Sequence, residues 1–104
     1  RGLGDVYKRQ MPDRFDLSQN YPNPFNPETI IPYAVPEAAD VRMTIYNVLG
    51  QHAATLGDER LAAGVHRIAW DGKDVFGRGV ASGLYFVRLQ ANTFSSVKKM
   101  MLLK

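Results

Sequence analysis

The chain has 104 residues, 45% of them hydrophobic and 22% charged, with a formal net charge of +3. This length suits a single domain with a modest core and leaves no room for a second, catalytic lobe. The absence of cysteine excludes a disulfide framework and a thiolate metal site, the scattered basic residues form no stripe for nucleic acid, and no apolar run is long enough for a membrane span or a signal peptide.

The first residues carry little pattern. Residues 1–10 mix charge and glycine without an apolar period, and we interpret them as a non-native or disordered leader. Residues 11–19 are polar apart from Phe15 and Leu17 and are predicted to form a flexible linker, so the domain proper is predicted to span residues 20–104. Because the chain begins with arginine rather than methionine, we expect it to be a fragment of a longer protein.

Next comes a segment of alternating asparagine and proline, residues 20–27, which we call the proline strap. It reads Asn20, Tyr21, Pro22, Asn23, Pro24, Phe25, Asn26 and Pro27. Each proline fixes its own φ and keeps the residue before it out of the helical region, which predicts an extended segment. Each asparagine can bond the backbone two residues on. We expect Tyr21 and Phe25 to anchor the strap against the rest of the fold.

The strands then follow at regular spacing. Residues 29–35 are β-branched and aromatic, but Pro32 cannot donate to a ladder, so an edge strand is predicted. Residues 41–47 alternate strictly between apolar and polar, as in a half-buried strand. A hairpin turn ending at Gly50 leads into a return strand over 51–56.

In the second half, residues 57–64 are predicted to form a polar connection, as a loop or with a short helical turn. A strand over 65–70 ends on Trp70, the only tryptophan, which is expected to be a pillar of the core. Turns cover 71–79, followed by strands at 80–82, 84–90 and 94–103. Seven short strands with glycine and asparagine turns predict an all-β, antiparallel β-sandwich.

Asp71 and Asp74 lie in the turn-rich segment 71–79. Closely spaced carboxylates on a loop can gather oxygen ligands for calcium. The same side chains can instead cap turns by bonding their own backbone, and Lys73 and Arg78 within the loop favour that interpretation. A weak calcium site stays open, and no other metal or cofactor is expected.

Other candidate sites are weaker still. His52 and His66 lie on different predicted strands without an acidic partner in register, so we interpret them as surface residues rather than as a metal or catalytic pair. Six aromatic residues could line a sugar-binding platform, although packing inside the sandwich is favoured. They are Tyr21, Phe25, Tyr33, Tyr46, Tyr85 and Phe86. Nothing in the sequence points to an enzyme.

Further motifs accompany the strap in a fixed order. They contain Tyr46, Asn47, Gly50, Gly64, Trp70, Asp71, Gly72, Asp74, Gly77, Gly83 and Tyr85, and the chain ends on Lys99, Met100, Leu102, Leu103 and Lys104. Together these residues resemble the type A C-terminal sorting domain of type IX (Por) secretion cargo. This variety is similar to the immunoglobulin-like domain of the flagellar hook-capping protein FlgD. The resemblance extends from Leu17 to Lys104.

The resemblance implies an immunoglobulin-like sandwich at the C-terminus of a secreted or cell-surface protein of a Gram-negative, Bacteroidota-like bacterium. Its implied partners are the outer-membrane type IX translocon, a sortase-like peptidase and, after processing, lipopolysaccharide. A signal peptide is expected upstream, and the domain is expected to be monomeric. The residues implied to present the signal are the last five named above, on a strand whose free edge a partner could read by strand addition.

Two other functions stay open. A structural domain of a flagellar hook cap would be inserted in its chain, with further hook-cap sequence upstream, whereas the motifs here stop at Lys104 as in a C-terminal tag. An adhesive or carbohydrate-binding sandwich appended to a secreted enzyme would bind glycans through exposed aromatic side chains.

Overall fold

The computed structural model describes residues 12–104, so the leader expected at residues 1–10 lies outside the described residues. The described chain forms seven strands and no helix, as the all-β prediction required. The strands are β1 (Asp16–Leu17), β2 (Thr29–Val35), β3 (Ala39–Asn47), β4 (His52–Leu61), β5 (Gly64–Trp70), β6 (Gly83–Ala91) and β7 (Phe94–Leu102).

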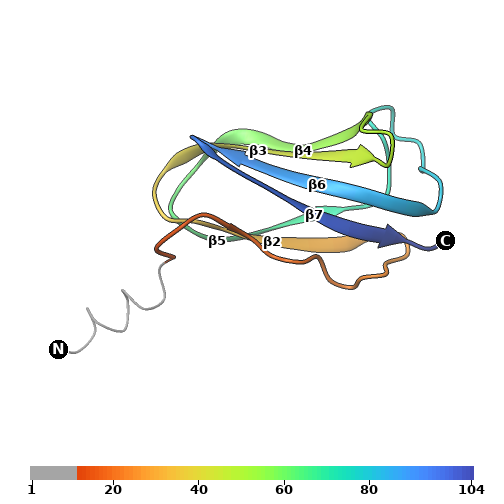
Figure 1. Cartoon of the computed structure of the whole chain (residues 1–104), viewed down its shortest axis with the longest axis horizontal. Helices are drawn as coiled ribbons and strands as arrows, with labels where there is room; N and C mark the ends of the chain where they lie inside the picture. The colour runs from red at the N-terminus through yellow and green to blue at the C-terminus, as the bar shows by residue number, and fades with distance from the viewer. Residues whose placement is uncertain (1–11) are drawn as a thin grey trace.

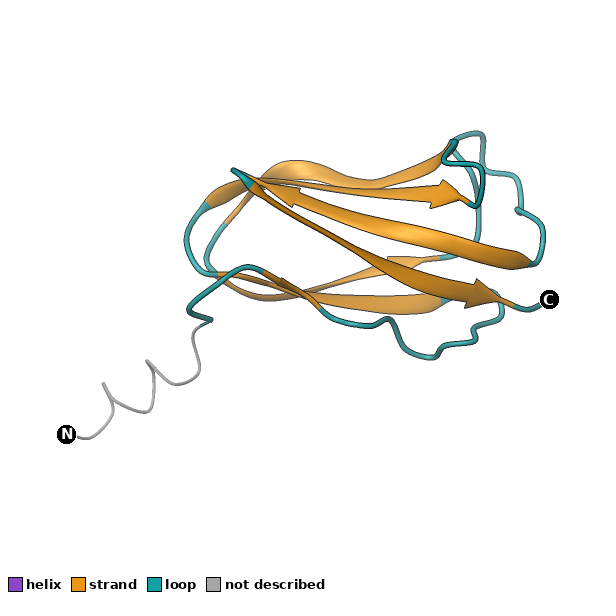
Figure 2. Ribbon diagram, in the orientation of Figure 1, coloured by secondary structure: helices purple, strands orange, loops and turns teal. Residues whose placement is uncertain are grey.

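The strands form two antiparallel sheets that face each other (Figure 1). One sheet has the order β1-β2-β5 and the other the order β4-β3-β6-β7. Figure 2 shows that loops gather at the two ends of the sandwich, and the proline strap runs along the lower sheet toward the C-terminal end. Every named pair is antiparallel, so the predicted antiparallel β-sandwich is confirmed.

Alternation along the strands builds the core. In β2 every second residue from Thr29 to Val35 is buried, and β6 shows the same pattern from Tyr85 to Ala91. Trp70 ends β5 with 1% of its surface exposed, which confirms it as a core residue. Its indole N–H donates to the Lys73 carbonyl at 3.0 Å, so the one polar atom of the side chain is satisfied.

Strand β2 is not the edge strand that Pro32 predicted, because it lies between β1 and β5. The Pro32 carbonyl accepts a hydrogen bond from the Ser18 amide at 3.0 Å, on the β1 side. The nitrogen and carbonyl of one strand residue point to the same side. The donor that Pro32 lacks is therefore missing toward the very short β1, and the ladder between β2 and β5 stays complete.

Two further predictions for the second half were wrong. Residues 57–61, predicted to be a loop or helical turn, continue β4 and pair with residues 39–43 of β3. Their polar side chains suggested a loop, yet they suit this position because β4 is an edge strand with its charges in solvent. Residues 80–82 form no strand; instead Lys73 and Gly79 make an isolated bridge.

The segment interpreted as a linker also contains structure. Asp16 and Leu17 form β1 and pair with β2, and Leu17 is only 2% exposed. The Phe15 ring stacks on Phe94, at the start of β7, with centroids 5.4 Å apart. Both apolar residues of the linker therefore contact the sandwich, so flexibility is not a property of this segment as a whole.

Candidate functional site

The proline strap begins at a buried polar cluster. Asn20, only 2% exposed, donates from its side-chain amide to the Pro22 carbonyl at 3.2 Å and to the Thr29 hydroxyl at 2.9 Å. The Thr29 hydroxyl in turn donates to the same Pro22 carbonyl at 2.9 Å. The predicted bond from an asparagine to the backbone two residues on is thus confirmed at Asn20. The role of Thr29, itself buried, was missed from the sequence.

The middle of the strap is joined to the last strand. The Phe25 amide donates to the Met101 carbonyl, and the Leu103 amide donates to the Phe25 carbonyl, both at 2.9 Å. The Asn23 side chain accepts a bond from the Met101 amide at 2.9 Å. Gln19, just before the strap, donates from its side chain to the Lys99 carbonyl at 2.6 Å. The strap therefore occupies the outer edge of β7 along residues 99–103.

The other side of the strap is joined to β2. Tyr21 and Ile30 exchange two backbone hydrogen bonds of 2.9 Å. Because β2 and β7 belong to different sheets, the strap connects the two sheets, pairing with β2 where β1 no longer does and with the outer edge of β7. Only one of its aromatic residues is an anchor as predicted: Phe25 is 2% exposed, whereas Tyr21 is 49% exposed.

The strap also bends between its bridges rather than running fully extended, and its three prolines follow cis peptide bonds. Gly72, in the loop after β5, lies against its end. With φ near +74°, Gly72 has a conformation that favours glycine, and a Cβ there would lie 3.1 Å from the Pro27 carbonyl oxygen. A side chain at residue 72 would therefore push the loop away from the strap.

The residues implied to present the sorting signal divide into two sets. Met100 and Leu102 are 1% and 0% exposed and belong to the core. Lys99, Leu103 and Lys104 are exposed. The prediction that β7 offers an open edge for strand addition is wrong for residues 99–103, because the strap already takes those backbone groups. Any partner that reads this end of the folded domain meets the exposed side chains instead.

The loop after β5 uses its carboxylates as turn caps. Asp71 accepts a bond from the Lys73 amide at 3.1 Å, and Asp74 accepts bonds from the Phe76 and Arg78 amides at 2.9 and 3.0 Å. The Arg78 amide first, then the Phe76 amide and the Arg78 guanidinium 3.8 Å away, hold the pKa of Asp74 below its usual value. The turn interpretation is confirmed. Among the described residues no group of three potential ligands is arranged to hold a metal ion.

The two histidines have separate surroundings. His52 shares a bond of 2.8 Å with the Thr55 hydroxyl, whereas His66 shares one of 2.8 Å with the Ala62 carbonyl. The His66 ring stacks on Tyr33 with centroids 5.4 Å apart. Burial and the nearby charge of Glu59 raise the pKa of the Tyr33 phenol. The histidines are thus surface residues, as predicted.

The aromatic residues do not form a platform. Phe25, Tyr33 and Tyr85 are buried, and Tyr46 and Phe86 are half-buried partners across β3 and β6. The Tyr85 hydroxyl donates to the Ala81 carbonyl at 2.6 Å, and burial raises the pKa of this phenol. Packing therefore accounts for most of these residues, as favoured.

The remaining motif residues shape turns. The Asn47 side chain accepts bonds from the Leu49 and Gln51 amides at 2.9 and 3.0 Å, which closes the hairpin between β3 and β4. All the motif glycines have positive φ. They are Gly50, Gly64, Gly72, Gly77 and Gly83. We find these motif residues at turns and in the core rather than gathered around one pocket.

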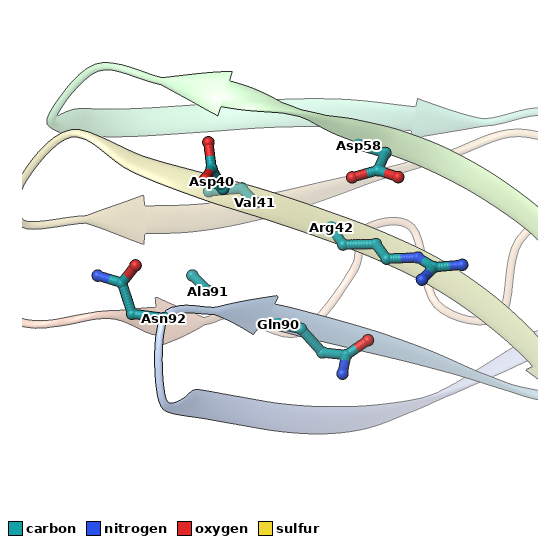
Figure 3. A pocket seen from close by; sticks show the side chains of 7 residues that line it. All are labelled: Asp40, Val41, Arg42, Asp58, Gln90, Ala91 and Asn92. Carbon is teal, nitrogen blue, oxygen red and sulfur yellow. The ribbon is translucent and has the colours of Figure 1, made fainter.

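A shallow hollow lies among β3, β4 and β6 (Figure 3). Its polar side chains come from Asp40, Arg42, Asp58, Gln90 and Asn92. In Figure 3 they point away from one another rather than toward a common centre, so they offer no convergent set of ligands. Asp40 is instead paired with Arg60 at 3.5 Å, and both side chains are exposed. The hollow has no aromatic lining.

The fold and its strap define a class of protein: an immunoglobulin-like β-sandwich whose last strand is held by a segment near its N-terminus. A family model of the FlgD Ig-like domain matches residues 27–95, more than half of the chain. The chain therefore belongs to the FlgD Ig-like domain family. No helix that could cross a membrane is found among residues 12–104.

Solved structures share this fold. Dimeric latent PorU from Porphyromonas gingivalis matches with a TM-score of 0.68 and 20% identity, over 88% of this chain and 9% of that one. FlgD from P. aeruginosa matches with a TM-score of 0.58 and 21% identity, over 71% of this chain and 57% of that one. FlgD from Xanthomonas campestris, a protein of flagellar hook capping, matches with a TM-score of 0.59 and 24% identity, over 93% of this chain and 73% of that one. The chain thus spans a small part of PorU and somewhat over half of P. aeruginosa FlgD. No curated protein matched the sequence.

Proposed function

We propose that this domain is a C-terminal sorting module that directs its parent protein through the type IX secretion system to the cell surface or the medium. The observation that carries the proposal is the junction between the strap and the chain's last residues. The strap region and the end of β7 form one structural unit. Hydrogen bonds from Gln19 to Lys99 and from Met101 to Asn23 join residues 80 and 78 positions apart. A sorting signal read in the folded state needs its terminal residues held in a fixed conformation, and the strap provides this.

The match to PorU supports a modular role. The region of PorU that resembles this chain is 9% of a much longer protein, so a sandwich of this kind occurs there as a small part of a large chain. The motif resemblance given above supplies the specific pathway. By that resemblance a translocon would recognise the module, and a peptidase would cut on its N-terminal side.

In this proposal two terminal residues, Leu103 and Lys104, are the contacts of the translocon. Leu103 is 51% exposed although it is large and apolar, and its amide is fixed by the Phe25 carbonyl. The Lys104 amide is fixed by the Ser82 hydroxyl at 2.9 Å. Rigid backbone with exposed side chains suits specific recognition, because little entropy is lost on binding.

The test is an export assay. The whole chain is fused behind a fluorescent protein targeted to the periplasm, in a host with type IX secretion and in an isogenic strain without the translocon. We expect translocon-dependent fluorescence at the surface or in the medium. Retention in the periplasm of both strains, with the domain shown to be folded, would refute the proposal.

Point variants sharpen this assay better than a truncation. Removing residues 99–104 would also remove the buried Met100 and Leu102 and so unfold the sandwich. Leu103→Ser changes an exposed side chain and should reduce export while leaving the unfolding midpoint unchanged. Leu49→Ser is the matched control, since Leu49 is 78% exposed on a hairpin of the same sandwich. Equal export of both variants would mean that Leu103 is not read.

A structural role in a flagellar hook cap is the second candidate, favoured by the two FlgD matches and the family itself. In that role the domain would contact neighbouring subunits of an assembly rather than a translocon. Restoration of motility by this chain, exchanged for the corresponding domain of a hook-cap protein, would support this candidate, and export in the assay above would not occur.

A further inference from the structure

Three of the four sheet edges carry a feature that protects them, along at least part of their length, against pairing with another chain. Strand β1 has only two residues. Strand β4 carries exposed charges at residues 58–60, and two register shifts interrupt its pairing with β3. Strand β7 is covered along residues 99–103 by the strap. Short length, charge, bulges and covering segments are the usual means of protecting an edge.

Apart from one exposed charge, Arg67, strand β5 has none of these protections. It is seven residues long and pairs with β2 without a register shift. On β2, Ile30 directs its backbone groups toward the strap and Pro32 directs its carbonyl toward β1. Because successive residues of a strand face opposite sides, the odd-numbered residues of β2 direct their backbone groups toward β5. Their partners on β5 are the even-numbered residues. The odd-numbered residues Val65, Arg67 and Ala69 therefore direct their amides and carbonyls outward, and none of these groups has a bonding partner among residues 12–104.

The side chains beside this edge form an apolar surface with one cation at its centre. Val65, Arg67 and Ala69 are exposed, Val65 to 62%. Their neighbours across the ladder are Ala34, Pro32 and Ile30, all half-buried. The Arg67 guanidinium makes no ion pair or hydrogen bond with another side chain in the described part of the molecule. The surface thus lacks an acidic group opposite Arg67.

We propose that the β5 edge is a docking site for an extended strand of another protein that places a carboxylate opposite Arg67. The added strand would exchange backbone hydrogen bonds with Val65, Arg67 and Ala69. On the face of the sheet that carries the Arg67 side chain, the added strand would have an acidic residue at its centre and small or β-branched residues on either side of that residue. Its residues on the other face would be apolar, next to the partly buried Ile68. This proposal is independent of the secretion function.

A second copy of the chain is a poorer occupant. In an antiparallel pair of two β5 edges, the register that uses all three outward residues sets Arg67 opposite the Arg67 of the other copy. Like charges directly opposite each other across strands are destabilising. Other registers leave outward groups unpaired. The charge on the edge therefore favours a different, acidic strand.

The test uses a synthetic seven-residue peptide, acetylated and amidated at its ends, with a central glutamate, a valine on each side and threonines beyond. Binding to the whole chain is followed through the backbone amide signals in NMR. We expect the largest shifts at Val65, Arg67 and Ala69. Arg67→Glu should weaken binding about fivefold or more and should favour the same peptide with a central lysine, since an opposite-charge pair becomes a like-charge pair.

Two further changes distinguish backbone pairing from charge attraction alone. Methylation of the glutamate nitrogen, which faces the domain, should abolish binding, whereas methylation of a flanking valine nitrogen, which faces away, should not. On the protein, Ala69→Pro removes a donor that is not part of the ladder with β2, and Ala69→Ser is the matched control. Only the proline variant should lose binding while both stay folded.

Several results would overturn the proposal. One is the absence of binding at millimolar peptide, and another is equal binding of the two methylated peptides. Shifts confined to β4 or β7 would place the peptide elsewhere. A dimer in sedimentation experiments that Ala69→Pro abolishes and Ala69→Ser does not would identify a second copy as the occupant of this edge.

Discussion

The rings of Phe25 and Trp70 lie with their centroids 5.7 Å apart and their planes tilted by 55°, inside the sandwich. Phe25 comes from the proline strap and Trp70 from the end of β5. Trp70 also contacts Tyr85 of β6 edge-on at 5.3 Å. Phe25, the anchor of the strap, therefore packs on a tryptophan that joins the two sheets.

The first prediction concerns this aromatic pair. Phe25→Ala and Trp70→Ala should each lower the free energy of unfolding by about 3 to 5 kcal/mol, because each removes a large, fully buried side chain. The double variant should lose about 0.5 to 1.5 kcal/mol less unfolding free energy than the sum of the two single losses, because aromatic contacts contribute energies in this range. Urea unfolding of the four proteins measures the cycle.

A loss below about 1 kcal/mol for Trp70→Ala would contradict its place in the core. Tyr21→Ala serves as the control within the strap, since Tyr21 is half-exposed and should cost less than Phe25→Ala. If the two losses were reversed, Tyr21 rather than Phe25 would be the anchor.

The second prediction concerns Asn20. Asn20→Ala should lower the free energy of unfolding by about 1 to 3 kcal/mol, because it removes one hydrogen-bond partner from the buried Thr29 hydroxyl and one from the Pro22 carbonyl. Asn26→Ala is the matched control: Asn26 is an exposed asparagine of the same strap and should change stability by less than about 0.5 kcal/mol. Equal effects in urea unfolding would argue against the polar cluster.

The third prediction compares two buried threonines. Thr44, on β3, is fully buried, and its hydroxyl has no hydrogen-bond partner among the described residues. Thr44→Val should therefore raise the free energy of unfolding by about 1 kcal/mol, since it replaces an unsatisfied hydroxyl with a methyl group of similar size. Thr29→Val should act in the opposite direction by about 1 to 3 kcal/mol, because that hydroxyl makes two bonds.

Thermal unfolding of both threonine variants shows whether each substitution raises or lowers the stability. A loss of stability in Thr44→Val would show that its hydroxyl has a partner in solution. A gain in Thr29→Val would argue against the cluster around Asn20.

Much of the fold was predictable because the signals are local. Strict alternation over residues 41–47 and the glycine and asparagine turns identify strands and hairpins without knowledge of the partners. The side of β2 on which Pro32 lacks its donor is different, because it depends on a distant neighbour. The composition of residues 57–61 likewise suggests a loop unless the strand is known to be an edge.

The candidate site was predictable only in part. The alternation of asparagine and proline marked the strap, and the capacity of Asn20 for a local bond could be read from residue type. Its attachment to Met101 could not, because that bond joins residues 78 positions apart. The free edge of β5 was also hidden, since it follows from what protects the other three edges rather than from the residues of β5.

The last prediction concerns pH and Asp74. The Arg78 amide, the Phe76 amide and the Arg78 charge favour the ionised carboxylate, so the pKa of Asp74 in the folded domain lies below 3.8. A group whose pKa is lowered on folding contributes stability that is fully present above its unfolded value and is lost as pH falls through its folded value. The contribution from Asp74 should therefore persist down to about pH 4 and disappear below it.

NMR titration of the Asp74 carboxyl carbon measures this pKa directly, and a midpoint at or above 3.8 would contradict the prediction. Asp74→Asn keeps an acceptor for the two amides but cannot titrate. The difference in unfolding free energy between the original chain and this variant should be constant near neutral pH and should shrink below about pH 4, whereas the other carboxylates titrate in both proteins and cancel. A difference that stayed constant down to pH 2 would mean that the amides bond the neutral side chain as strongly as the carboxylate.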